Sequence, residues 1–89
     1  MICCELEIIN KLGLHARATA KLVKLLQGYE SKTSLKFNEL SANGKSIMSV
    51  MMLAAAQGSI ITFYVDGVDE QSCMQDITKL IMNRFGEDE

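Results

Sequence analysis

Residues 13–28, GLHARATAKLVKLLQG, decide the fold because the hydrophobic pattern changes its period there. From Ala16 to Gln27 the apolar residues recur at spacings of three and four, as in a helix with one buried face. That face contains Ala18, Thr19, Leu22, Val23, Leu25 and Leu26, and the opposite face carries a basic ridge of Arg17, Lys21 and Lys24. Gly28 occupies the place of a left-handed C-terminal cap. The stretch therefore predicts an amphipathic helix over residues 16–27.

Four segments around this helix alternate apolar and polar residues, which is typical of strands with one buried face. They cover residues 2–8, 32–37, 40–42 and 59–66. Asn38 and Glu39 join the second and third strands as a hairpin turn, and Asn suits the positive φ that such turns often need. Each strand is therefore expected to lay one apolar face on a shared core.

Two more helices complete the pattern. One covers Ser46 to Leu53, with Ser46 as its N-cap. The other begins after a capping Asp69, ends before Gly86 and buries a stripe of Cys73, Met74, Ile77, Leu80 and Ile81. The order is β-α-β-β-α-β-α over one domain, residues 1–89. Because every strand has one apolar face, we expect an α+β fold: a four-stranded antiparallel sheet with three helices on one face and water on the other.

Composition and charge narrow the classes of function. A formal net charge of −2 and an acidic end, Glu87-Asp88-Glu89, argue against nucleic-acid binding through bulk electrostatics. An RNA-binding sheet would expose aromatic residues, and Tyr64 is the only one that the alternation places on the open face. No apolar run approaches the ~20 residues that span a bilayer, and the N-terminus lacks the basic segment and apolar core of a signal peptide. We therefore expect a cytoplasmic protein that binds no nucleic acid and inserts into no membrane.

The cysteines predict free thiols rather than a disulfide or a metal site. Cys3, Cys4 and Cys73 are odd in number, and neighbouring cysteines rarely bridge to each other. With a single histidine in the chain they also make a poor set of zinc ligands. We expect that the chain holds neither a metal nor an organic cofactor.

His15, the only histidine, stands where the loop of residues 10–14 meets the first helix. The first amides of a helix lack internal partners and carry partial positive charge, so they stabilise an anion and favour a neutral, nucleophilic imidazole. Arg17 adds a guanidinium that matches phosphate oxygens. Gly13 lets the backbone turn tightly, so that the imidazole stays exposed. Taken alone, this pattern is more often a solvent-exposed histidine cap beside a solvated arginine.

Two motifs together resemble one family. Gly13-Leu14-His15-Ala16-Arg17 resembles the active-site segment of the HPr family, the histidine phosphocarriers of the phosphoenolpyruvate-dependent phosphotransferase system. Lys45-Ser46-Ile47-Met48, followed by residues 50–53, resembles the family's second signature at the expected distance. The resemblance covers essentially the whole chain and implies an open-faced β-sandwich. Ala18 stands where many members have proline, a change that loosens preorganisation slightly without removing a chemical group.

The resemblance assigns roles to the residues of the first motif. It implies that His15 accepts a phosphoryl group on Nδ1, that Arg17 acts as a charge clamp, and that the amides of Ala16 and Arg17 meet the phosphate. Enzyme I would be the donor and an EIIA-type protein the acceptor, in sugar uptake or in regulation, and the chain would be a monomeric carrier rather than a stand-alone enzyme. Two alternatives stay open: a carrier of a nitrogen-related regulatory branch, and a regulatory binding module that no longer transfers the group.

The second motif predicts regulation and docking. Ser46 resembles the serine that an ATP-dependent HPr kinase/phosphorylase modifies in some members; the alternative is that it only caps its helix. The helix of residues 46–53 is too apolar to bury entirely: Val50, Leu53 and Ala54 can face the sheet, which leaves methionines outside. The expected docking face for both partners, an apolar patch beside a basic ridge, contains Ala20, Lys21, Lys24, Ile47, Met48 and Met51.

Overall fold

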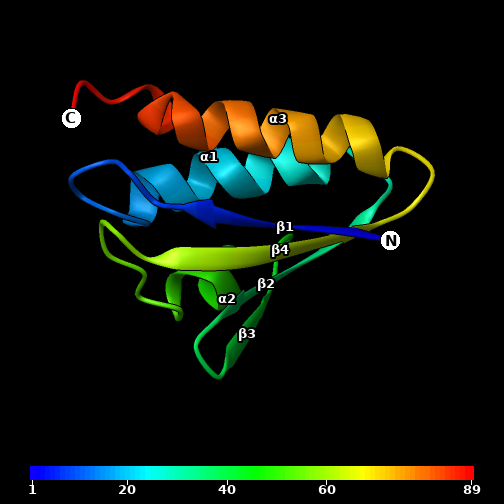
Figure 1. The fold of residues 1–89 in the computed structure, drawn as a ribbon, viewed down its shortest axis with the longest axis horizontal. Helices are drawn as coiled ribbons and strands as arrows, with labels where there is room; N and C mark the ends of the chain where they lie inside the picture. Colours follow the sequence, from blue (N-terminus) through cyan, green and yellow to red (C-terminus); the bar gives the residue numbers. More distant parts are fainter.

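A computed structural model describes all residues, 1–89, and contains the predicted sheet and helices (Figure 1). In chain order the elements are β1 (Ile2–Glu7), α1 (Ala16–Gln27), β2 (Lys32–Phe37), β3 (Leu40–Asn43), α2 (Ile47–Met51), β4 (Ile60–Asp66) and α3 (Glu70–Met82). A 3₁₀ turn, η1 (Arg84–Gly86), follows α3. None of the helices has the length and apolar character needed to cross a bilayer. The predicted element order and the bounds of α1 and β2 are confirmed, and the other bounds differ by one to three residues.

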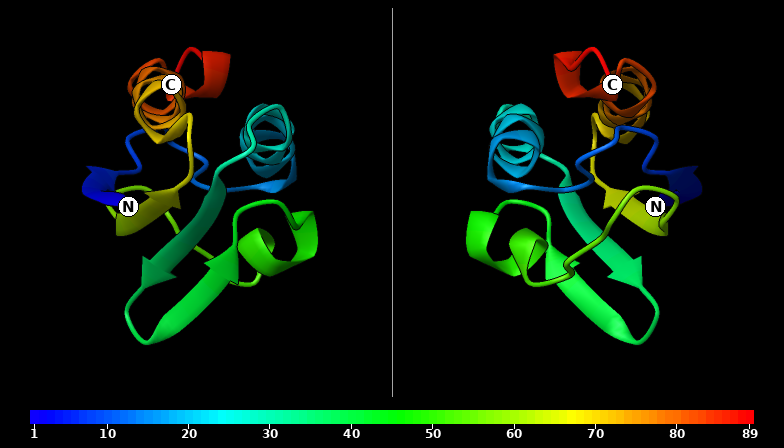
Figure 2. Two further views of the ribbon diagram at one scale, coloured as in Figure 1. Left: turned by 90° about the vertical axis from the view of Figure 1, so that its right-hand side faces the viewer. Right: turned by 90° about the vertical axis from the view of Figure 1, so that its left-hand side faces the viewer.

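The four strands form one antiparallel sheet in the order β1-β4-β2-β3. Thr62 in β4 pairs with Glu5 of β1 on one side and with Lys36 of β2 on the other, and these polar side chains lie on the open face. The alternate residues face the helices, with α1 and α3 side by side and α2 next to β3 (Figure 2). The open-faced arrangement follows from the period of two along each strand.

The core lies between the sheet and the helices. Its largest fully buried side chains are Phe63, Phe85, Ile8, Leu22, Leu26, Leu35, Ile61, Ile77 and Ile81. The apolar stripes predicted for α1 and α3 supply most of the helical share, with Leu25 and Leu80 only partly buried. Phe85 comes from the 3₁₀ turn after α3, so the C-terminal segment is anchored in the core.

Two predicted helix caps, Gly28 and Asp69, occupy the cap positions but differ from the prediction in geometry. Gly28 has φ −78° rather than a left-handed conformation, because its amide donates to the carbonyl of Leu25 at 3.1 Å and tightens the last turn of α1. Asp69 precedes α3 but its carboxylate makes no cap hydrogen bond. That carboxylate accepts hydrogen bonds from the amides of Glu30 and Ser31 and from the Ser31 hydroxyl, and these bonds lower its pKa, the Ser31 hydroxyl most.

The second helix is shorter than predicted, and one of its expected core residues is outside. α2 ends at Met51, and Ala54 has φ +52°, so the helical spacing does not extend to it. Ala54 is therefore exposed, whereas Val50, Leu53 and the unpredicted Ala55 are buried. The hairpin turn is confirmed, with φ +56° at Asn38.

Candidate functional site

Gly13 sets the direction in which the chain enters α1. It has φ +67°, and a side chain there would bring its Cβ within 2.6 Å of the carbonyl oxygen of Ala55. The next residue, Leu14, donates its amide to that same carbonyl at 2.9 Å. The Gly13 carbonyl accepts a hydrogen bond of 2.8 Å from the side-chain amide of Asn10, which is fully buried. This close approach of two backbones fixes His15 at the first turn of the helix.

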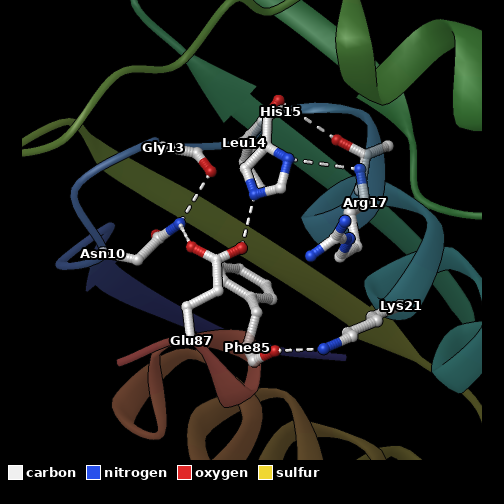
Figure 3. A network of polar contacts seen from close by, with 9 residues as sticks. Asn10, Gly13, Leu14, His15, Arg17, Lys21, Phe85 and Glu87 are labelled. Carbon is white, nitrogen blue, oxygen red and sulfur yellow. Dashed lines mark hydrogen bonds and ion pairs between the residues drawn. The ribbon is translucent and has the colours of Figure 1, made fainter. Parts of the chain in front are cut away.

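His15 is the N-cap of α1, and its ring turns back over the open end of the helix (Figure 3). The Nδ1 atom accepts a hydrogen bond of 3.3 Å from the amide of Arg17, and the His15 carbonyl accepts the amide of Thr19 at 2.9 Å. The side chain is 28% exposed. The predicted orientation of the ring toward the amides of the first turn is confirmed, although the ring is less exposed than the loop alone suggested.

Glu87 reaches the other nitrogen of the same ring, a contact that the sequence did not predict. One carboxylate oxygen, Oε2, contacts Nε2 of His15, and the other, Oε1, accepts a hydrogen bond of 2.9 Å from Asn10 (Figure 3). The hydrogen bond from Asn10, and then that from His15, hold the pKa of Glu87 below its ordinary value. The two residues are 72 positions apart, and the sequence marks residues 87–89 only as an acidic end, so no local pattern predicted the contact.

The two neighbours of the ring determine its tautomer. An amide N–H can only donate, so Nδ1 beside Arg17 must carry the lone pair. An ionised carboxylate can only accept, so Nε2 beside Glu87 must carry the proton. A neutral imidazole in this arrangement has its nucleophilic nitrogen at the anion-stabilising end of α1.

Beside the His15 ring lies an open hollow of about 700 Å³. Its lining includes His15, Ala16, Arg17, Lys11, Leu12 and the acidic residues 87–89. The Arg17 side chain is exposed, lies beside the imidazole and makes no hydrogen bond or ion pair within the chain (Figure 3). The amide of Ala16 is likewise without a partner at the helix start. The hollow thus brings one nucleophile together with two cations, Arg17 and Lys11, with the free amide of Ala16 and with the carboxylates of residues 87–89.

The second motif lies on α2. Ser46 is its N-cap, as predicted, and accepts the amide of Ser49 at 3.2 Å. The side chains of Ile47, Met48 and Met51 are 46%, 73% and 40% exposed, so the predicted apolar surface exists, and Met52 adds to it at 74%. On α1, Ala20, Lys21 and Lys24 are also exposed. Lys21 is not free, however, because its ammonium donates to the carbonyl of Phe85 at 2.6 Å.

The cysteines lie apart from this site. Cys3 is exposed on the open sheet face, Cys4 is half-buried and Cys73 is buried, and all three are free thiols. Burial raises the pKa of the Cys73 thiol. No three histidine, cysteine, aspartate or glutamate side chains lie close enough together to hold a metal ion.

The fold and the site define a small α+β protein whose single imidazole offers Nδ1 to an anion at a helix N-terminus. Residues 2–83 match the PTS-HPr family, described as "PTS HPr component phosphorylation site". The chain is 52% identical to phosphocarrier protein HPr of Xylella fastidiosa over 94% of each chain, and 51% identical to that of Cupriavidus necator over the whole of both. A crystal structure of HPr from Thermoanaerobacter tengcongensis superposes with a TM-score of 0.96 at 34% identity, covering 100% of both chains. This chain belongs to the HPr family of phosphocarriers of the phosphotransferase system.

Proposed function

We propose that this protein takes a phosphoryl group from phosphorylated enzyme I onto Nδ1 of His15 and passes it to an EIIA-type protein. The observation that carries the proposal is the hydrogen bond that Nδ1 of His15 accepts from the Arg17 amide at the start of α1. Family membership supports the two partners. In-line transfer needs positioning and charge stabilisation more than covalent chemistry from the protein. The free guanidinium of Arg17 and the amides of Ala16 and Arg17 would bind the phosphoryl oxygens.

The docking surface for both partners comprises Ala20, Lys21, Lys24, Ile47, Met48 and Met51. Exposed methionines adapt to more than one partner, and the lysines favour an acidic rim around an apolar pocket. Because Lys21 already donates to a backbone carbonyl, Lys24 and Arg17 supply more of the free positive charge. We propose that the carrier works as a monomer in the cytoplasm, with one partner bound at a time.

Regulation at Ser46 belongs to the same proposal. Its hydroxyl is half-buried at the start of α2, next to Ile47 and Met48 of the docking surface. A phosphate from an ATP-dependent kinase would add a charge of about −1.5 to −2 there. Ser46→Asp is then expected to raise the KM for enzyme I without lowering kcat, whereas Ser46→Ala is expected to leave both unchanged. An unchanged KM in Ser46→Asp would remove the support for this regulation.

The experiment that tests the carrier is labelling with phosphoenolpyruvate and enzyme I. The purified protein is expected to acquire a phosphoryl group that is labile in acid and stable in base. His15→Ala should take up none, and Arg17→Ala should take it up about 100-fold more slowly. A label that persists in His15→Ala contradicts the proposal.

A chase with EIIA-type proteins then separates the remaining alternatives. Transfer to a sugar-specific EIIA supports uptake, and transfer only to a nitrogen-related EIIA supports the regulatory branch. A labelled protein that passes its group to neither would be a binding module rather than a carrier.

A further inference from the structure

The Glu87 carboxylate is held between two donors that leave it little freedom. Its side chain is 15% exposed, with one oxygen on Nε2 of His15 and the other on the side-chain amide of Asn10. Asn10 is fully buried and also donates to the carbonyl of Gly13. Both neighbours of the Asn10 nitrogen are acceptors, so the amide must present its NH₂ group to them. Asn10 therefore ties the carboxylate to the loop that orients His15.

The C-terminal segment is built to bring Glu87 to this place. Phe85 is 1% exposed in the core, and Arg84 and Phe85 both have φ +55°, a costly conformation for residues with a Cβ. The Phe85 carbonyl accepts the ammonium of Lys21, and the Glu87 amide donates to the Arg84 carbonyl at 2.9 Å. Core packing and hydrogen bonds together balance the cost of this backbone and direct the Glu87 side chain inward.

We propose that Glu87 is a positioning residue: its carboxylate keeps the proton of His15 on Nε2, so that Nδ1 holds the lone pair, and it then faces the positive ring while the phosphoryl group is carried. The inference rests on the proposed function, because it assigns Glu87 a part in phosphoryl transfer through His15. Glu87 touches the ring and not the phosphoryl group, since the two nitrogens lie on different sides of the imidazole (Figure 3).

The step is balanced without any proton transfer. The Nδ1 lone pair attacks phosphorus, the Nδ1–P bond forms, the bond from phosphorus to phosphorylated enzyme I breaks, and its electron pair stays on enzyme I. The proton remains on Nε2, so the product is a phosphorylated imidazolium whose positive charge lies against Glu87. When the next protein attacks phosphorus, the Nδ1–P electron pair returns to Nδ1. The same tautomer is regenerated, ready for another cycle.

The other charges near the ring do not replace Glu87. Lys11 pairs with Glu89 at the surface, where their side chains are 66% and 72% exposed. Lys21 adds a smaller attraction to the Glu87 carboxylate, and its ammonium is engaged by Phe85. Arg17 and Asp88 line the hollow without an ion pair. Glu87 is the one carboxylate that contacts the imidazole.

The test is Glu87→Gln, with Glu89→Gln as the matched control. Glutamine has the same shape, and its amide oxygen can still accept from Asn10. Its NH₂ group then faces Nε2 and favours a lone pair there, which moves the proton to Nδ1. Long-range ¹H–¹⁵N spectra of the His15 ring are expected to show mainly the Nε2–H tautomer in the wild type and in Glu89→Gln, and a shift toward Nδ1–H in Glu87→Gln. Amide spectra check that each variant is folded.

Transfer kinetics give the second readout. The kcat for phosphoryl uptake in Glu87→Gln is expected to fall by about 10- to 100-fold, as when a partner that orients a histidine is lost, with an unchanged KM for enzyme I. A wild-type tautomer with a wild-type kcat overturns the inference, and so does a change in KM alone, which would mean that the tail serves docking. If the wild-type protein takes up no phosphoryl group, the proposed function fails, whereas the tautomer comparison still decides the action of Glu87 on the ring.

Discussion

Two segments from opposite ends of the chain reach the same imidazole ring, and they are positioned by different forces. Residues 10–17 are placed by local geometry: a glycine with positive φ, a helix start and a histidine cap. Residues 84–87 are placed by long-range contacts, chiefly the burial of Phe85 and the hydrogen bond from Lys21. The first segment places Nδ1 against the Arg17 amide, and the second holds Nε2. One half of this site, residues 10–17, is therefore encoded by the local sequence, whereas the other half, residues 84–87, depends on the folded chain.

The largest effect on stability is expected from Gly13→Ala, which disrupts the locally encoded segment, residues 10–17. The new Cβ meets the Ala55 carbonyl at 2.6 Å and the residue must keep φ +67°. Backbone strain and overpacking together predict a loss of about 2–4 kcal/mol in the free energy of unfolding, measured with urea. Gly58→Ala is the control, because Gly58 has φ +91° with no atom nearby, and it should lose only about 1 kcal/mol. Equal losses would show that the backbone approach at Ala55 does not matter.

Asn10→Ala is expected to have the next largest effect on stability, since Asn10 hydrogen-bonds both the loop before α1 and the C-terminal segment. It removes the hydrogen bonds to Gly13 and Glu87, but it also removes the Asn10 Oδ1 atom, which is buried without a partner. We expect a net loss of about 1–2 kcal/mol in urea unfolding, and weaker ordering of Glu87 in side-chain spectra. A variant with wild-type stability and an unchanged position of Glu87 would mean that residues 10–17 and residues 84–87 are positioned independently of each other.

The pH dependence of stability tests the charge of Glu87, which lies in the segment that long-range contacts position. The pKa of Glu87 is lowered in the folded protein, first by Asn10 and then by His15, so the unfolded chain binds more protons. Its contribution to stability is therefore present above pH 4.5, the ordinary pKa of the group, and is lost as the pH falls through the lower folded value. Glu87→Gln should flatten this part of the acid-unfolding profile, and Glu89→Gln should not. Asp69, whose pKa is lowered mainly by the Ser31 hydroxyl, accounts for a separate part of the acid-unfolding profile.

The smallest effect is expected from Lys21→Met, which loosens the C-terminal segment without touching the ring. The lost hydrogen bond to the Phe85 carbonyl lies near the surface, so the expected change in unfolding free energy is about 0.5 kcal/mol. Hydrogen exchange is the sharper measurement, because the Glu87 amide, bonded to Arg84, should exchange faster. Lys24→Met, in the same basic ridge, should leave that amide unchanged. Equal exchange rates in the two variants would contradict the anchoring role of Lys21.

These contrasts explain how much could be predicted from the sequence. The periods of two and 3.6 are local, so the strands and the buried faces of α1 and α3 were predictable. Of the residues at the site, those from Gly13 to Arg17 were predictable, because they lie next to one another at the first turn of α1. Helix caps were less predictable, because a carboxylate such as that of Asp69 can accept hydrogen bonds from a loop distant in sequence instead of from its own helix. The contact between His15 and Glu87 needs the core position of Phe85, which no local pattern encodes.

The most direct test of the roles of His15 and Glu87 is the position of the phosphoryl group on the imidazole ring. In uniformly ¹⁵N-labelled protein phosphorylated by enzyme I, the coupling between ³¹P and ¹⁵N identifies the bonded nitrogen of His15. Phosphorus is expected on Nδ1, with a proton still on Nε2 beside Glu87. Phosphorus on Nε2 would contradict these roles, because the nitrogen that Glu87 occupies would then be the one that carries the group.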